Sequence, residues 1–140
     1  MNPKRVFSGR AIPLLTLSAA LAYMALIYFL AELPGYLHVE SDWWLRAMLW
    51  NLLHIPLYAG LAFIWMFPAS FLSIRPVKRS YLVLGICIVF GLVDEWHQIH
   101  IPTRSASFLD IALDTAGAGL GIWLYRRHFG AQSEGKFQVD

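Results

Sequence analysis

Four stretches of this chain are long and apolar enough to cross a lipid bilayer, which excludes most soluble folds. A hydrocarbon core of about 30 Å requires about 20 residues of helix. We predict membrane spans over residues 12–31, 47–67, 81–99 and 108–125. Only 14% of the residues are charged, against roughly 25% in soluble domains. The sequence therefore predicts an all-α, polytopic integral membrane protein, with residues 1–140 forming a single transmembrane domain.

The first stretch carries no charge but follows Lys4, Arg5 and Arg10, as the apolar core of a secretory signal peptide would. Such cores span about 7–15 residues and precede a cleavage motif of small residues. This stretch is longer and no clear motif follows it, so we interpret it as an uncleaved span. The polar residues 130–140 are predicted to form a flexible tail.

The positive charges gather on one side of the predicted spans. Nine of the 11 Lys and Arg residues lie before the first span, between the second and third, or after the fourth. Arg46 and Arg104 are the two on the other side. Since cytoplasmic segments carry an excess of Lys and Arg, we predict a multi-pass protein of the cell membrane with both termini in the cytoplasm.

Three of the four spans carry polar residues at a similar depth. At ~1.5 Å per helical residue, these residues lie ~18–24 Å from the inner ends of their spans: His54, Glu95, Asp110 and Asp114. A charge at mid-membrane costs ~2.5–3.5 kcal/mol on insertion scales, and such residues usually face the interior of a helix bundle. We therefore predict a polar pocket formed by the last three spans, with the first span as an apolar anchor.

Helical spacing supports this pocket, because polar residues fall on shared faces of the last three spans. His54 and Tyr58 share a stripe of the second span, and Glu95 and Gln98 share one in the third. In the fourth span, Asp110 and Asp114 continue the stripe that contains Gly117-x-x-x-Gly121. That glycine motif permits close approach of a neighbouring helix or of a second copy of the chain.

Several of these residues also have a purely structural interpretation. Ser107-x-x-Asp110 is typical of a capped helix start, and Arg104 is equally suited to an ion pair across the loop. His54 is also compatible with a satisfied buried histidine. Asp94 and His97 are assigned to the membrane interface, His97 because it lies off the face of Glu95.

These residues resemble the VanZ-like family of membrane proteins, named for a teicoplanin-resistance factor. The resemblance covers about residues 50–122. Its parts are Asn51-Leu52-Leu53-His54-Ile55-Pro56-Leu57-Tyr58, Asp94-Glu95-Trp96-His97-Gln98, Pro102-Thr103-Arg104-Ser105-Ala106-Ser107, Asp110, and Asp114-Thr115-Ala116-Gly117-Ala118-Gly119-Leu120-Gly121. The resemblance implies a role in low-level tolerance of glycopeptide antibiotics at the cell envelope.

Two positions depart from the pattern of that family. Asn51 stands where the family often has a lysine, and Asp114 where it usually has an asparagine. The second departure adds a carboxyl group to the cluster, so the pocket either binds a cation or holds Asp114 protonated.

Two functions follow from these residues. In the first, a non-catalytic outer-leaflet pocket binds a lipid headgroup, a cell-wall precursor or a glycopeptide antibiotic. Its predicted ligand-binding residues are His54, Tyr58, Glu95, Gln98, Arg104, Asp110 and Asp114. In the second, the chain is a membrane enzyme acting on a lipid-linked substrate, with His54 or Glu95 as general base.

A divalent metal held by the imidazole and the carboxylates is chemically plausible for the enzyme. No compact motif such as His-Glu-x-x-His is present, so we assign no metal ligand, and the sequence does not identify a cofactor. A transporter or channel is a third interpretation, and four short spans would then require several copies of the chain. We expect membrane lipid as a partner, no nucleic acid, and an oligomer contact through Gly117 and Gly121.

Overall fold

Four helices make up the parts of the chain that the computed structural model describes, which are residues 3–32, 43–101 and 107–134. The helices are α1 (Pro3–Glu32), α2 (Trp43–Ser70), α3 (Pro76–Gln98) and α4 (Phe108–Glu134). These ranges contain no strand, so the all-α prediction is confirmed.

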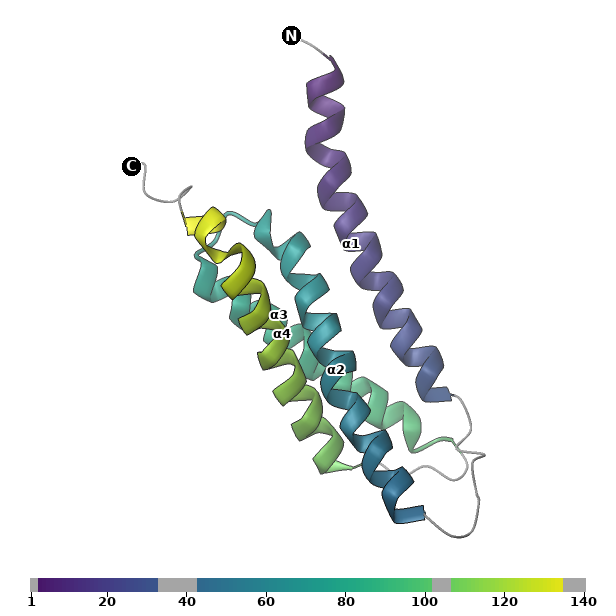
Figure 1. The fold of residues 1–140 in the computed structure, drawn as a ribbon. Helices are drawn as coiled ribbons and strands as arrows, with labels where there is room; N and C mark the ends of the chain where they lie inside the picture. Colours follow the sequence, from purple (N-terminus) through teal and green to yellow (C-terminus); the bar gives the residue numbers. More distant parts are fainter. Residues whose placement is uncertain (1–2, 33–42, 102–106, 135–140) are drawn as a thin grey trace.

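Successive helices run in opposite directions along the bundle (Figure 1). One end of the molecule therefore holds the first turn of α1, the connection between α2 and α3, and the last turn of α4. The other end holds the last turn of α3 and the first turn of α4. The basic residues at the start of α3 and near the end of α4 therefore lie at the same end: Arg75, Lys78, Arg79, Arg126 and Arg127.

Three of the helices contain segments long and apolar enough to cross a membrane, namely Ala11–Ala31, Asn51–Ser70 and Pro76–Gln98. Helix α4 is similar in length, but two aspartates and several glycines make it less apolar. Large apolar side chains on the outer faces of all four helices are exposed, among them Leu15 at 72% and Val89 at 61%. Hydrocarbon chains can cover such faces, as expected for an all-α transmembrane protein.

The fourth helix continues beyond the predicted span. It ends at Glu134, so residues 130–134, which were predicted to belong to a flexible tail, continue the helix. Phe129 packs against Phe63, Phe67 and Tyr125, with ring centroids 6.2, 5.5 and 5.2 Å away. This aromatic contact with α2 anchors the helix near Gly130, and no proline follows to end it. Residues 135–140 lie outside the described part of the chain.

The first helix is attached to the bundle less closely than the others. It packs against α2 and α3 and makes no contact with the described residues of α4. Its first half stands apart from the other helices (Figure 1). Ile27 and Ala31, in its last turns, are buried. The end of α1 opposite its N-terminus is therefore the part that joins the other helices.

Candidate functional site

Close contact between α2 and α4 brings the polar faces of these two helices together. A Cβ atom at Gly117 would overlap the carbonyl oxygen of Ile55, and one at Gly121 would overlap that of Ala59. Only glycine permits this approach at both positions. The predicted close approach is thus confirmed, but it occurs within one chain. Both glycines are buried against α2, and an oligomer contact through them stays a prediction.

The same contact places the carboxyl group of Asp114 beside the ring of His54. The Nδ1 atom of His54 lies 2.8 Å from Oδ1 of Asp114. The side chain of Asp114 is 2% exposed and that of His54 is 17% exposed. When Asp114 is ionised its oxygen can only accept, so Nδ1 of His54 must carry the proton of this bond. The Nε2 atom then remains for another partner.

Gly91 of α3 has no side chain and so leaves room for the second carboxyl oxygen of Asp114 and for the hydroxyl of Tyr58. A Cβ atom at Gly91 would lie 3.0 Å from Oδ2 of Asp114 and 3.4 Å from the hydroxyl oxygen of Tyr58. The Tyr58 ring also lies stacked beside that of His54, with the centroids 6.5 Å apart. Tyr58 of α2 and Asp114 of α4 therefore pack against α3 at a position that has no side chain.

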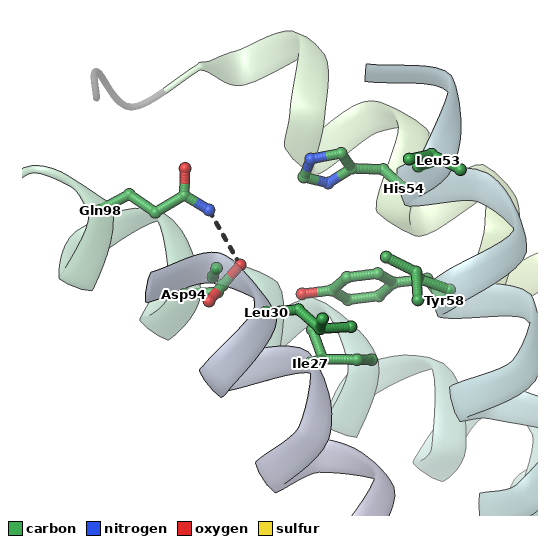
Figure 2. A pocket seen from close by; sticks show the side chains of 9 residues that line it. Ile27, Leu30, Leu53, His54, Tyr58, Asp94 and Gln98 are labelled. Atoms are coloured by element: carbon green, nitrogen blue, oxygen red, sulfur yellow. Dashed lines mark hydrogen bonds between the residues drawn. The ribbon is translucent and has the colours of Figure 1, made fainter. Parts of the chain in front are cut away.

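A cavity of about 50 Å³ opens next to His54 and Tyr58, between α1, α2 and α3. Its apolar wall comes from α1 and α2: Ile27, Leu30, Ala31, Leu53 and Leu57. Its polar lining consists of His54, Tyr58, Asp94 and Gln98. Figure 2 shows the His54 ring and the Tyr58 hydroxyl pointing across the cavity toward the two polar residues of α3.

Asp94 and Gln98 form the opposite polar wall. The Nε2 atom of Gln98 donates a hydrogen bond of 3.0 Å to Oδ2 of Asp94, joining two successive turns of α3 (Figure 2). Their side chains are buried, at 2% and 3% exposure. The Oδ1 atom of Asp94 has no hydrogen-bond partner within the described parts of the chain. Asp94, which was given no site role in the sequence, therefore lines the cavity with its side chain buried inside the bundle.

Glu95 is buried as well, but it serves a different contact. Its Oε2 atom accepts a hydrogen bond of 2.6 Å from the backbone nitrogen of Ser107. The hydroxyl of Ser107 in turn accepts one of 3.2 Å from the backbone nitrogen of Leu109, as in a capped helix start. Glu95 therefore fastens the end of α3 to the beginning of α4.

The structure brings together part of the predicted ligand-binding set. His54, Tyr58 and Gln98 line the cavity, and Asp114 reaches it through His54. Glu95 and Asp110 are buried nearby without lining it. A ligand role for these two stays a prediction. Arg104 lies outside the described residues. His97, which was assigned to the interface, stacks on Tyr28 of α1 with 4.4 Å between the ring centroids.

The sequence analysis missed two parts of the site, namely Asp94 and the wall formed by α1. Asp94 could have been found from its i, i+4 spacing to Gln98, which indicates a shared helix face. The contribution of α1 has no polar signal, since Ile27, Leu30 and Ala31 are all apolar. The predicted pocket of the last three spans is therefore corrected. The cavity is lined by α1, α2 and α3. Helix α4 contributes Asp114, which contacts His54 without lining the cavity.

Among the described residues, no group of three or more His, Cys, Asp or Glu side chains is arranged so that it could hold a metal ion.

Comparison with known proteins gives one match. A family model described as VanZ/LLP1 matches residues 10–129 of the chain. No curated protein and no solved structure matches it. The matched range includes every described residue that lines the cavity, together with Asp114.

Proposed function

Because the chain belongs to the VanZ/LLP1 family, we propose that it binds the polar headgroup of a membrane lipid or of a lipid-linked cell-wall precursor. The cavity beside His54 is the proposed site. The observation that carries this proposal is the composition of its walls: apolar side chains from α1 and α2 face four polar side chains. A ligand with a polar group attached to hydrocarbon complements such walls.

The size of the cavity favours a small headgroup. About 50 Å³ exceeds the space needed for one water molecule, and it is far too small for a whole glycopeptide antibiotic. If the chain contributes to antibiotic tolerance, we therefore expect it to act through a lipid or lipid-linked precursor and not by enclosing the antibiotic.

The proposed topology gives the cavity access to the outer leaflet. We propose that all four helices cross the cell membrane and that both termini are cytoplasmic, as the distribution of Lys and Arg indicates. His54 lies 16 residues before Ser70 and Asp94 lies 18 residues after Pro76. At ~1.5 Å per residue these are ~24 and ~27 Å from the cytoplasmic ends of α2 and α3. The site then belongs to the envelope side of the membrane.

Filling the cavity tests this function. Leu57→Phe adds bulk to its apolar wall, whereas Leu92→Phe adds the same bulk at an exposed position of α3. Both variants and the original protein would be purified in detergent, and bound lipid would be measured by native mass spectrometry. We expect Leu57→Phe alone to lose bound lipid. Equal lipid binding by all three proteins, or none by the original protein, would overturn the proposal.

The contact between His54 and Asp114 favours a second function, that of an enzyme acting on the bound lipid. A carboxylate that holds Nδ1 of a histidine leaves Nε2 free to take a proton from an attacking hydroxyl or water. His54 lines the cavity, so a headgroup bound there would lie next to this base.

This enzyme hypothesis is tested by following lipid headgroups during incubation with purified protein. Mass spectrometry should show loss or exchange of a headgroup that His54→Gln abolishes. If the original protein binds lipid and leaves every headgroup unchanged over hours, the enzyme hypothesis fails and the binding function stands.

A further inference from the structure

We infer that the headgroup bound in the cavity carries a primary ammonium group, held by Asp94, Tyr58 and Gln98. This inference rests on the proposed function and narrows it to one class of lipid. The chemistry that selects the ligand is a set of oxygen atoms that can accept a hydrogen bond and that no donor of the described chain satisfies.

One buried oxygen atom of the cavity-lining residues, Oδ1 of Asp94, has no hydrogen-bond partner in the described part of the chain. The hydroxyl of Tyr58 is also buried; its hydrogen is directed to the carboxyl group of Asp114, which leaves its oxygen to accept a further hydrogen bond. Their side chains are 2% and 1% exposed, so bulk water does not reach them freely. Buried polar atoms are nearly always paired, with protein, water or ligand. Figure 2 shows the Tyr58 hydroxyl directed toward Asp94 across the cavity.

Gln98 adds a third acceptor on the same wall. Its Nε2 atom is engaged with Asp94, which leaves the amide oxygen to face another donor. In Figure 2 this oxygen points away from Asp94. An ammonium group has three hydrogens to donate and no acceptor. It therefore matches a cavity that offers acceptors on three side chains, of which the carboxyl group of Asp94 and the hydroxyl of Tyr58 lie opposite each other.

The charges around the cavity also favour a cation. Among the described residues that line it there is an aspartate and no lysine or arginine. The histidine of the lining is already in contact with the carboxyl group of Asp114. Glu95 and Asp110 are buried nearby on the same helices, α3 and α4. An anionic headgroup entering this site would meet carboxyl groups, whereas an ammonium group would be attracted by them.

Hydrogen-bond donation separates this inference from simple attraction of positive charge. Phosphatidylethanolamine and phosphatidylcholine have the same net charge, but only the ethanolamine group can donate hydrogen bonds. The three methyl groups of choline also require more space than the ammonium hydrogens in a cavity of about 50 Å³. Phosphatidylglycerol offers hydroxyl donors on an anionic lipid.

The test compares these three lipids with identical acyl chains, added to the full chain in detergent and measured by native mass spectrometry. We expect phosphatidylethanolamine to bind about tenfold more tightly than either of the others, a difference equivalent to one well-placed charged hydrogen bond. Equal or tighter binding of phosphatidylcholine or phosphatidylglycerol would overturn the inference while leaving lipid binding intact. Binding of none of the three would remove the proposed function itself.

Free phosphoethanolamine serves as a competitor that carries the same ammonium group without hydrocarbon. It should displace the lipid only in large excess, since it lacks the chains that contact the apolar wall. Displacement at equal concentration would show a site for a soluble amine and would overturn the assignment to a lipid.

Two variants connect the preference to named atoms. Asp94→Asn replaces the carboxylate by an amide and should remove most of the tenfold preference. Tyr58→Phe deletes one oxygen and keeps the ring, so it tests the same wall even if Asp94→Asn fails to fold. Tyr125→Phe is its matched control, because Tyr125 is also buried but lies in the aromatic cluster with Phe63. If Tyr58→Phe and Tyr125→Phe retain the same preference, the inference is wrong.

Discussion

The Nδ1 atom of His54 and the Oδ1 atom of Asp114 lie 2.8 Å apart across the contact between α2 and α4. The two residues are 60 positions apart in the sequence, so this bond fixes the relative position of the two helices. It also fixes the orientation of the imidazole ring at the cavity. The pair therefore contributes both to stability and to the site.

We predict that Asp114→Ala lowers the free energy of unfolding by about 1–3 kcal/mol, because the ring of His54 loses its partner in a buried position. Asp114→Asn keeps an acceptor oxygen and should cost less. Denaturant unfolding in detergent, followed by circular dichroism, measures both. A double-mutant cycle compares His54→Ala, Asp114→Ala and the variant that carries both substitutions. Strictly additive effects would show that the two side chains are not coupled.

Much of this arrangement follows from the sequence alone. The length of the apolar stretches predicted the helices, and the spacing of Asp114, Gly117 and Gly121 predicted a polar and close-packed face on α4. Periodicity cannot identify the partner of that face, because it describes one helix at a time. That the partner is α2, through the backbone at Ile55 and Ala59, required the structure.

A physical cause explains why Asp94 was left out of the site predicted from the sequence. Asp94 lies near the end of a span, and it was assigned to the interface. In the structure the last turns of α1 pack over this region, with Ile27 and Ala31 buried. An apolar helix that covers a polar residue gives no signal in its own sequence, since its side chains could equally face lipid.

The glycines of α4 differ in what surrounds them, which gives a direct test of the helix contact. Gly121→Ala places a methyl group against the carbonyl oxygen of Ala59, whereas Gly119→Ala meets nothing within 4 Å. We predict that Gly121→Ala destabilises the protein by about 1–3 kcal/mol, a typical cost of overpacking, and that Gly119→Ala has almost no effect. Thermal unfolding in detergent distinguishes them. Equal melting temperatures would contradict the described packing of α2 on α4.

A second pair of glycines tests the site without replacing any of its functional groups. A methyl group at Gly91 would crowd Asp114 Oδ2 and the Tyr58 hydroxyl, whereas one at Gly85 of the same helix meets nothing within 4 Å. We predict that Gly91→Ala weakens lipid binding by about fivefold, equivalent to about 1 kcal/mol of misplacement. Gly85→Ala should bind as the original protein does. Native mass spectrometry of bound lipid provides the measurement, and equal affinities would show that these two oxygen atoms do not shape the site.

Glu95 is predicted to matter for the start of α4 through its bond to Ser107. Glu95→Leu removes the acceptor for the partly buried backbone nitrogen of Ser107, so the first turn of α4 should open more often. Glu95→Gln keeps an acceptor oxygen and is the matched control. Hydrogen–deuterium exchange at residues 107–110 should be faster in Glu95→Leu only. If Glu95→Gln is equally disturbed and binding is lost in both, the carboxylate itself acts on a ligand, as the sequence had suggested.

The predicted topology can be tested with introduced cysteines, since Cys87 is the single cysteine of the chain and is 1% exposed. Ser73→Cys lies in the exposed turn between α2 and α3, on the same side as Arg75. Ser41→Cys lies in the segment that joins α1 to α2. A membrane-impermeant maleimide added to intact cells should label Ser41→Cys and leave Ser73→Cys unlabelled until the cells are opened. The reverse pattern would place the basic residues outside, and the cavity would then face the cytoplasmic leaflet, where a different pool of lipids is available.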